Sequence, residues 1–341
     1  MMIKNEKKIN LGLQLLRMIS SIWVVIIHCY FEISKRQPNY YLQKKQFHVP
    51  NFMFLSFYFY YRLISQRNIS KIIQRFKRLL IPYLIYPFVF LVINNICLEI
   101  FGWGNFGKKL SLKDYLIQIL LGEKYYGSFW YLASLLFISL IFCIFAFLIR
   151  NYFLFIIQLF GFIIYKIHRS SIYDYLKKRN LLKCPFVLTI RFTPIAVIGL
   201  TFGSLNLIDN IKNNYARNIV INIIFLYFLL NYNIFNFNNI FIYPDVDSLT
   251  IGAINFFSIF SLLPLEKIKN KKIIITLRYI TNHTGGIYYL HIFIFFYLKK
   301  IYISVRISPI LGIIIIYMTA YFICFFGSKL LKKSMLKYLF N

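Results

Sequence analysis

LRMISSIWVVIIHC, residues 16–29, is an apolar run with an arginine near one end and a histidine near the other. With its flanks the run is long enough to cross a bilayer as a helix, because about 20 apolar residues span the hydrocarbon core. Ionisable side chains in such segments are costly and almost always face the interior of a helix bundle. The run therefore predicts a membrane-spanning helix with one polar side.

The spacing of Arg17 and His28 strengthens this prediction. The two residues are eleven positions apart; at 100° per residue this is about 20° more than three full turns, and the rise between them is about 16 Å. Both therefore lie on one face, close to Gln14 and Ser21. Two simpler readings stay open: Arg17 could extend to the interface, and His28 could be a structural histidine.

The composition extends the membrane reading to the whole chain. Of the 341 residues, 59% are hydrophobic, 20% are aromatic and only 15% are charged, against about 25% charged residues in soluble domains. We expect an all-α, polytopic integral-membrane helical bundle in a single domain, 1–341. About ten transmembrane helices are predicted, near 11–31, 50–64, 79–101, 128–149, 151–167, 185–205, 217–237, 239–263, 273–298 and 303–327. Only Arg150-Asn151 separate the fourth and fifth, which form either a tight hairpin or one bent segment.

The formal charge of +30 does not indicate a nucleic-acid partner, because most lysines and arginines lie between apolar runs, where they would meet anionic lipid headgroups. The five cysteines include no CxxC pair, so we expect neither a disulfide framework nor a metal site. Lysines flank both the first and the last predicted span. By the positive-inside rule both termini are expected in the cytoplasm. The expected location is the plasma membrane. The basic connection 62–78 agrees with this orientation, and the basic connection 166–184 disagrees.

RFKRLLIPYL, residues 75–84, brings a second cationic group to the start of a span. Arg75 and Arg78 are three positions apart and hence neighbours on one helix face. Two guanidinium groups held together suit phosphate or carboxylate. The alternative is the ordinary basic collar of a transmembrane helix.

Two further stretches carry candidate residues. In TNHTGGIYYLHIFIF, residues 281–295, His291 lies within a predicted span and Tyr288 lies three positions before it on the same side. A buried histidine bonded to a neighbouring helix is an equally good reading. In YGSFWYLASLLF, residues 126–137, Trp130 lies at the start of a span, where an interfacial aromatic belt is the usual explanation.

Taken in order, these elements resemble the membrane acyltransferase-3 family. The resemblance covers nearly the whole chain and rests on five stretches: LRMISSIWVVIIH with Arg17 and His28, VPNFMFLSFYF, RFKRLLIPY with Arg75 and Arg78, FWYLASL, and YYLHIFI. One departure is Ser56-Phe57, where members often have Ser-Gly.

The resemblance implies an O-acyltransferase that moves an acetyl or other short acyl group from acetyl-CoA, or another acyl-CoA, to a hydroxyl of a cell-surface polysaccharide or lipid-linked carbohydrate. His28 would be the catalytic base or a transient acyl carrier, and Arg17 is the second residue assigned to the catalytic site. Arg75 and Arg78 would bind the donor phosphates, and His291, Tyr288 and Trp130 are further candidates. No metal is implied.

Other functions suit a membrane bundle with buried polar faces. A transporter or flippase for a polysaccharide or lipid-linked sugar is the main alternative, because such proteins also bind substrates between spans. An unrelated histidine-containing membrane acyltransferase would share the chemistry without the Arg17–His28 spacing.

Overall fold

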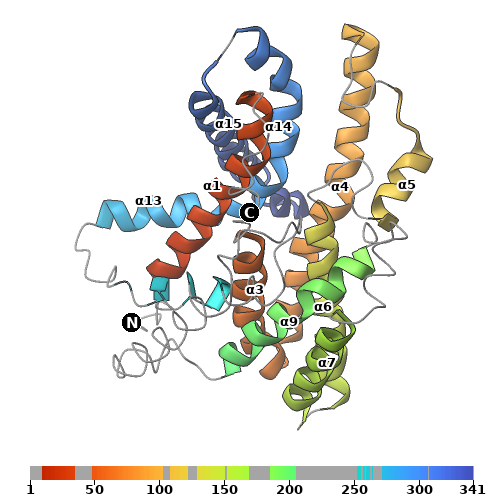
Figure 1. The fold of residues 1–341 in the computed structure, drawn as a ribbon, viewed down its shortest axis with the longest axis vertical. Helices are drawn as coiled ribbons and strands as arrows, with labels where there is room; N and C mark the ends of the chain where they lie inside the picture. The colour runs from red at the N-terminus through yellow and green to blue at the C-terminus, as the bar shows by residue number, and fades with distance from the viewer. Residues whose placement is uncertain are drawn as a thin grey trace, which may run out of the picture.

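The computed structural model describes residues 10–34, 48–102, 108–121, 129–149, 152–168, 185–204, 252–254, 256–257, 259–261, 263, 271–305 and 307–340. Within these ranges every regular element is a helix, which confirms the all-α prediction (Figure 1). The elements are α1 (Leu11–Ser34), α3 (His48–Ser65), α4 (Ile69–Phe101), α5 (Leu112–Leu121), α6 (Phe129–Leu148), α7 (Phe153–His168), α9 (Pro185–Ser204), α13 (Lys271–Asn282), α14 (Thr284–Ser304), α15 (Pro309–Leu330) and the 3₁₀ helix η3 (Met335–Leu339).

Four stretches of the described helices are long and apolar enough to cross a membrane: Leu11–Cys29, Ile69–Phe101, Tyr131–Leu148 and Pro309–Leu330. Three further apolar helices are shorter: Phe153–Ile167, Gly252–Ser261 and Thr284–Leu298. The chain is thus a multi-span membrane protein, while the number ten stays a prediction. The predicted span 217–237 and most of 239–263 lie outside the described residues.

Helix α4 shows how the sequence separates a lipid-facing side from a protein-facing side. Its N-terminus is capped by Asn68, whose side chain accepts from the Lys71 amide, and it ends at Gly102 in the left-handed conformation. Apolar residues exposed at every fourth position form one stripe: Leu80, Leu84, Phe88, Val92, Ile96 and Ile100. On the other side Tyr83, Tyr86 and Phe90 are buried. This is the pattern of a helix that packs on protein along one face only.

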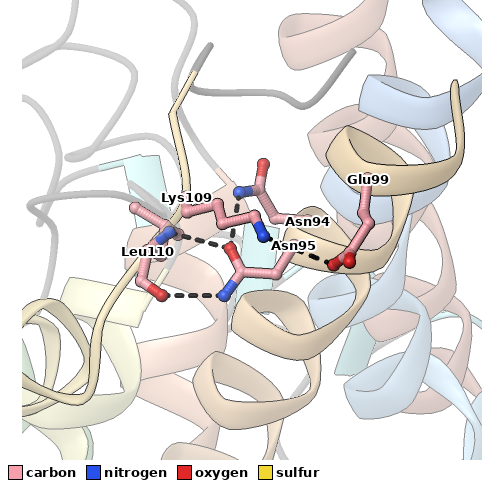
Figure 2. Close-up of polar contacts among 5 residues, drawn as sticks. All are labelled: Asn94, Asn95, Glu99, Lys109 and Leu110. Atoms are coloured by element: carbon pink, nitrogen blue, oxygen red, sulfur yellow. Dashed lines mark hydrogen bonds and ion pairs between the residues drawn. The ribbon is translucent and has the colours of Figure 1, made fainter. Parts of the chain in front are cut away.

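Two asparagines near the end of α4 fix the connection to α5 (Figure 2). Asn95 bonds both the amide and the carbonyl of Leu110, each at 2.8 Å, and Asn94 donates to the Lys108 carbonyl at 3.1 Å. An exposed ion pair joins Lys109 to Glu99 at 3.4 Å. The asparagine side chains thus provide hydrogen-bond partners for backbone groups of the segment that leads into α5.

The fourth and fifth predicted spans form the hairpin that was one of two expectations. α6 ends at Leu148 and α7 begins at Phe153. Phe145 and Phe160 face each other across the turn, with ring centroids 5.7 Å apart. The chain therefore reverses direction between α6 and α7.

Helices α3 and α9 approach each other closely because α9 carries glycines at the contact. A Cβ atom on Gly199 would lie 2.5 Å from the Phe54 carbonyl oxygen, and one on Gly203 would lie 2.4 Å from that of Tyr58. Small residues allow this kind of backbone approach between membrane helices.

The predicted span 273–298 is wrong as a single helix. The chain turns at His283, and α13 lies across the molecule at a steep angle to α14 (Figure 1). The His283 amide bonds to the Ile280 carbonyl, one residue nearer than an α-helix requires. Two glycines follow at 285 and 286, and glycine is a weak helix former.

The interior that matters for function lies where α1, α4, α6 and α14 meet. α1 packs against both α14 and α15. α4 meets α14 through aromatic side chains, with ring centroids 4.5 Å apart for Phe90 and Phe293 and 5.6 Å apart for Tyr86 and Tyr289. α6 contacts α4 and α3.

Candidate active site

Two histidines predicted from separate stretches lie side by side. His28 of α1 and His291 of α14 have ring centroids 5.4 Å apart, with an angle of 37° between the ring planes. His291 is buried, with no exposed surface. His28, in contrast, keeps exposed surface. The structure thus brings together the two imidazoles that the sequence could only propose one at a time.

The hydrogen bonding of His291 fixes which ring nitrogen is basic. Its Nδ1 lies 3.2 Å from the Ile287 carbonyl oxygen, which can only accept, so Nδ1 carries the hydrogen. In the neutral ring Nε2 then holds a lone pair. That atom is buried and has no hydrogen-bond partner among the described residues. His291 therefore presents a proton acceptor next to His28.

An aromatic wall adjoins the two histidines. Tyr288 lies 6.0 Å from His291 and 5.2 Å from Tyr131 between ring centroids. Phe52 closes the group, at 5.9 Å from Tyr288 and 6.3 Å from Tyr131. The side chain of Trp130 is outside the described part of α6. Its neighbour Tyr131 belongs to the wall, and sequence reasoning did not select it.

Three arginines gather at the other end of this wall. Arg17 interacts electrostatically with Tyr131 and Arg78. Arg75 interacts with the same two residues. The arginines of α1 and α4 that the sequence singled out thus share one region, and Tyr131 links that region to Tyr288 and the histidines.

Arg75 is largely occupied by contacts within the bundle. Its Nη2 lies 2.9 Å from the Ser56 hydroxyl and 3.2 Å from the Ser139 hydroxyl, and its Nη1 bonds to the Ser56 carbonyl at 3.4 Å. The guanidinium also lies 4.3 Å from the ring centre of Tyr60. These contacts tie α4 to α3 and α6. They leave Arg75 less free to bind a ligand than its position in the sequence suggests, so its role as a phosphate ligand stays a prediction.

Arg78 differs from Arg75 in its surroundings. It is exposed, and its guanidinium lies 6.0 Å from the ring centre of Tyr338 in η3. An exposed guanidinium beside an aromatic ring can still donate in the plane of its fork. Arg78 is therefore better placed than Arg75 to meet an anionic ligand.

Together these residues form an elongated site with two unlike ends. Arg17 and Arg78 make the cationic end, and His28 and His291 make the imidazole end. Along α1 the two ends are about 16 Å apart, at 1.5 Å per residue. Within the described ranges no group of three or more His, Cys, Asp or Glu residues could hold a metal ion. The arrangement suits a long substrate that is anionic at one end and reactive at the other.

A family model described as "Acyltransferase domain" matches residues 10–329. The match includes every residue of the site named above except Tyr338. No curated protein and no solved structure matches the chain.

Proposed function

Since the chain belongs to the membrane acyltransferase-3 family, as its motifs indicate, we propose that it transfers an acetyl or other short acyl group from acyl-CoA to a carbohydrate hydroxyl. The observation that carries the proposal is the elongated site, with arginines at one end and two histidines at the other. A CoA thioester has the same polarity, because its phosphates and its reactive carbonyl lie at opposite ends of an extended arm.

The donor phosphates would bind at the arginine end. Phosphate oxygens form strong, charge-assisted hydrogen bonds with guanidinium groups. Arg78 is exposed and Arg17 lies within its electrostatic range. The pantetheine arm would then follow the wall of Tyr131 and Tyr288 towards His28.

At the histidine end, His28 would act as general base. Its neutral ring takes the proton of a sugar hydroxyl while that oxygen attacks the thioester carbonyl carbon. The carbon–sulfur bond breaks, and the CoA thiolate receives the proton from the imidazolium. His291 supports this role, because its basic Nε2 adjoins His28 and can share the proton. The alternative is a covalent route in which His28 carries the acyl group.

The acceptor would be a hydroxyl of a polymeric or lipid-linked sugar at the plasma membrane, with both termini of the chain in the cytoplasm. The donor is then supplied from the cytoplasm, on the side where the positive-inside rule places the basic start of α4.

The test is transfer of label from [¹⁴C]acetyl-CoA to carbohydrate by the purified protein in lipid vesicles. We expect label on the sugar with the native protein and none with His28→Ala. Ile26→Ala is the matched control, because Ile26 lies on the opposite face of α1. Movement of glycan across the vesicle membrane without acyl-CoA would instead establish the transporter alternative and refute the proposal.

A further inference from the structure

The segment 334–340, here called the hook, folds back onto the bundle after α15. It contains η3 and packs against both α4 and α15 (Figure 1). The Ser334 hydroxyl accepts from the Leu336 amide at 3.1 Å, which starts the short helix. The hook thus lies beside the cationic end of the site instead of leading away from it.

Contacts with three parts of the bundle hold the hook in place. Tyr86 of α4 donates its hydroxyl hydrogen to the Leu339 carbonyl. His283 Nδ1 lies 2.8 Å from the Phe340 carbonyl oxygen. A Cβ atom on Gly327 would come within 2.7 Å of the Phe340 ring, so a larger residue there would force that ring to shift. Three separate elements therefore fix the path of the hook.

This path puts Tyr338 next to Arg78, with Lys337 also beside the Tyr338 ring. The ring centre of Tyr338 lies 6.0 Å from the Arg78 guanidinium and 5.3 Å from the Lys337 ammonium. Tyr338 and Lys337 are half-buried, and Arg78 is exposed. The ring of Tyr338 therefore lies close to two cationic groups, the Arg78 guanidinium and the Lys337 ammonium.

We propose that Tyr338, Lys337 and Arg78 form the subsite for the nucleotide end of the acyl donor. An adenine base can stack on an aromatic side chain without hydrogen bonds to the edge of the base. Guanidinium and ammonium groups bind the attached phosphates. The assignment of the nucleotide to an acyl donor rests on the proposed function. The subsite itself rests on the geometry of the hook.

The first test is direct binding of adenosine 3′,5′-bisphosphate, which is the nucleotide end of CoA without the arm, to the purified full chain. We expect Tyr338→Leu to weaken binding about tenfold, or about 1.4 kcal/mol, and Tyr338→Phe to preserve it. Lys337→Gln should also weaken binding. Met335→Ala is the control, because Met335 lies in the same hook and is exposed. Equal binding by the native protein and Tyr338→Leu would overturn the proposal.

The second test separates nucleotide recognition from a purely structural role of the hook. Tyr338→Leu should raise KM for acetyl-CoA about tenfold with kcat unchanged, and it should leave turnover of S-acetylpantetheine, which has no nucleotide, unaffected. Equal losses with both donors would mean that the hook only supports the fold. If Tyr338→Leu catalyses acyl transfer with an unchanged KM for acetyl-CoA, the subsite is refuted and the proposed function is not. Nucleotide binding with the expected variant pattern, but without any acyl transfer, would refute the proposed function alone.

Discussion

At the scale of single residues, the two histidines differ in accessibility and therefore in expected role. His28 is exposed, whereas His291 is buried with its Nδ1 hydrogen directed to the Ile287 carbonyl. The spacing of Arg17 and His28 was visible in the sequence because a helix repeats every 3.6 residues. The approach of His28 to His291 was not, because it depends on how α1 packs on α14.

We predict that His291→Asn lowers kcat at least 100-fold without lowering thermal stability. An asparagine amide can still donate to the Ile287 carbonyl, but it has no basic nitrogen in the place of Nε2, and positioned bases contribute about 10²- to 10⁴-fold. Initial rates and melting temperatures of the purified variant would be compared with those of the native protein. Near-native turnover by His291→Asn would show that His291 only packs.

The two arginines of α4 are expected to separate into a structural and a binding residue. In Arg75→Lys a single ammonium group cannot bond to both Ser56 and Ser139 as the guanidinium does. Hydrogen bonds to charged groups contribute about 1.5–3 kcal/mol. We expect this variant to unfold at a lower temperature. Arg78→Lys serves as its matched control and should retain stability. Equal stability of both variants would contradict the division of roles.

At the scale of elements, the sequence predicted the outer faces of the helices better than their ends. The stripe of exposed apolar residues on α4 follows directly from helical periodicity. The turn at His283 was missed because the apolar residues Ile273, Ile274 and Ile275 of α13 come shortly before the apolar α14. The signals at that point were the adjacent Gly285 and Gly286, together with the polar start of α13 at Lys271.

Close packing of α3 on α9 predicts a large effect from a small substitution. Gly199→Ala places a Cβ atom 2.5 Å from the Phe54 carbonyl oxygen, so the helices must separate. Overpacking of this kind costs about 1–3 kcal/mol. Denaturant unfolding in detergent would measure it. Gly252→Ala is the control, since a Cβ atom there meets nothing within 4 Å, and an equal loss in both variants would contradict this account of the contact.

At the scale of the whole molecule, the site exists only because distant segments converge. Arg17 and His28 come from α1, Arg78 from α4, Tyr131 from α6 and His291 from α14. Sequence motifs identified most of these residues one at a time. They missed Tyr131, because its neighbour Trp130 was selected, and the hook, because Lys337 looks like part of an ordinary basic flank.

The most direct measurement of the central claim is the steady-state kinetics of acyl transfer from acetyl-CoA by His28→Ala and Arg78→Gln. If the two ends of the site have the roles assigned to them, His28→Ala loses kcat at least 1,000-fold, whereas Arg78→Gln raises the donor KM and keeps most of kcat. Native turnover in His28→Ala would contradict the account. So would an Arg78→Gln defect confined to the KM of the carbohydrate acceptor.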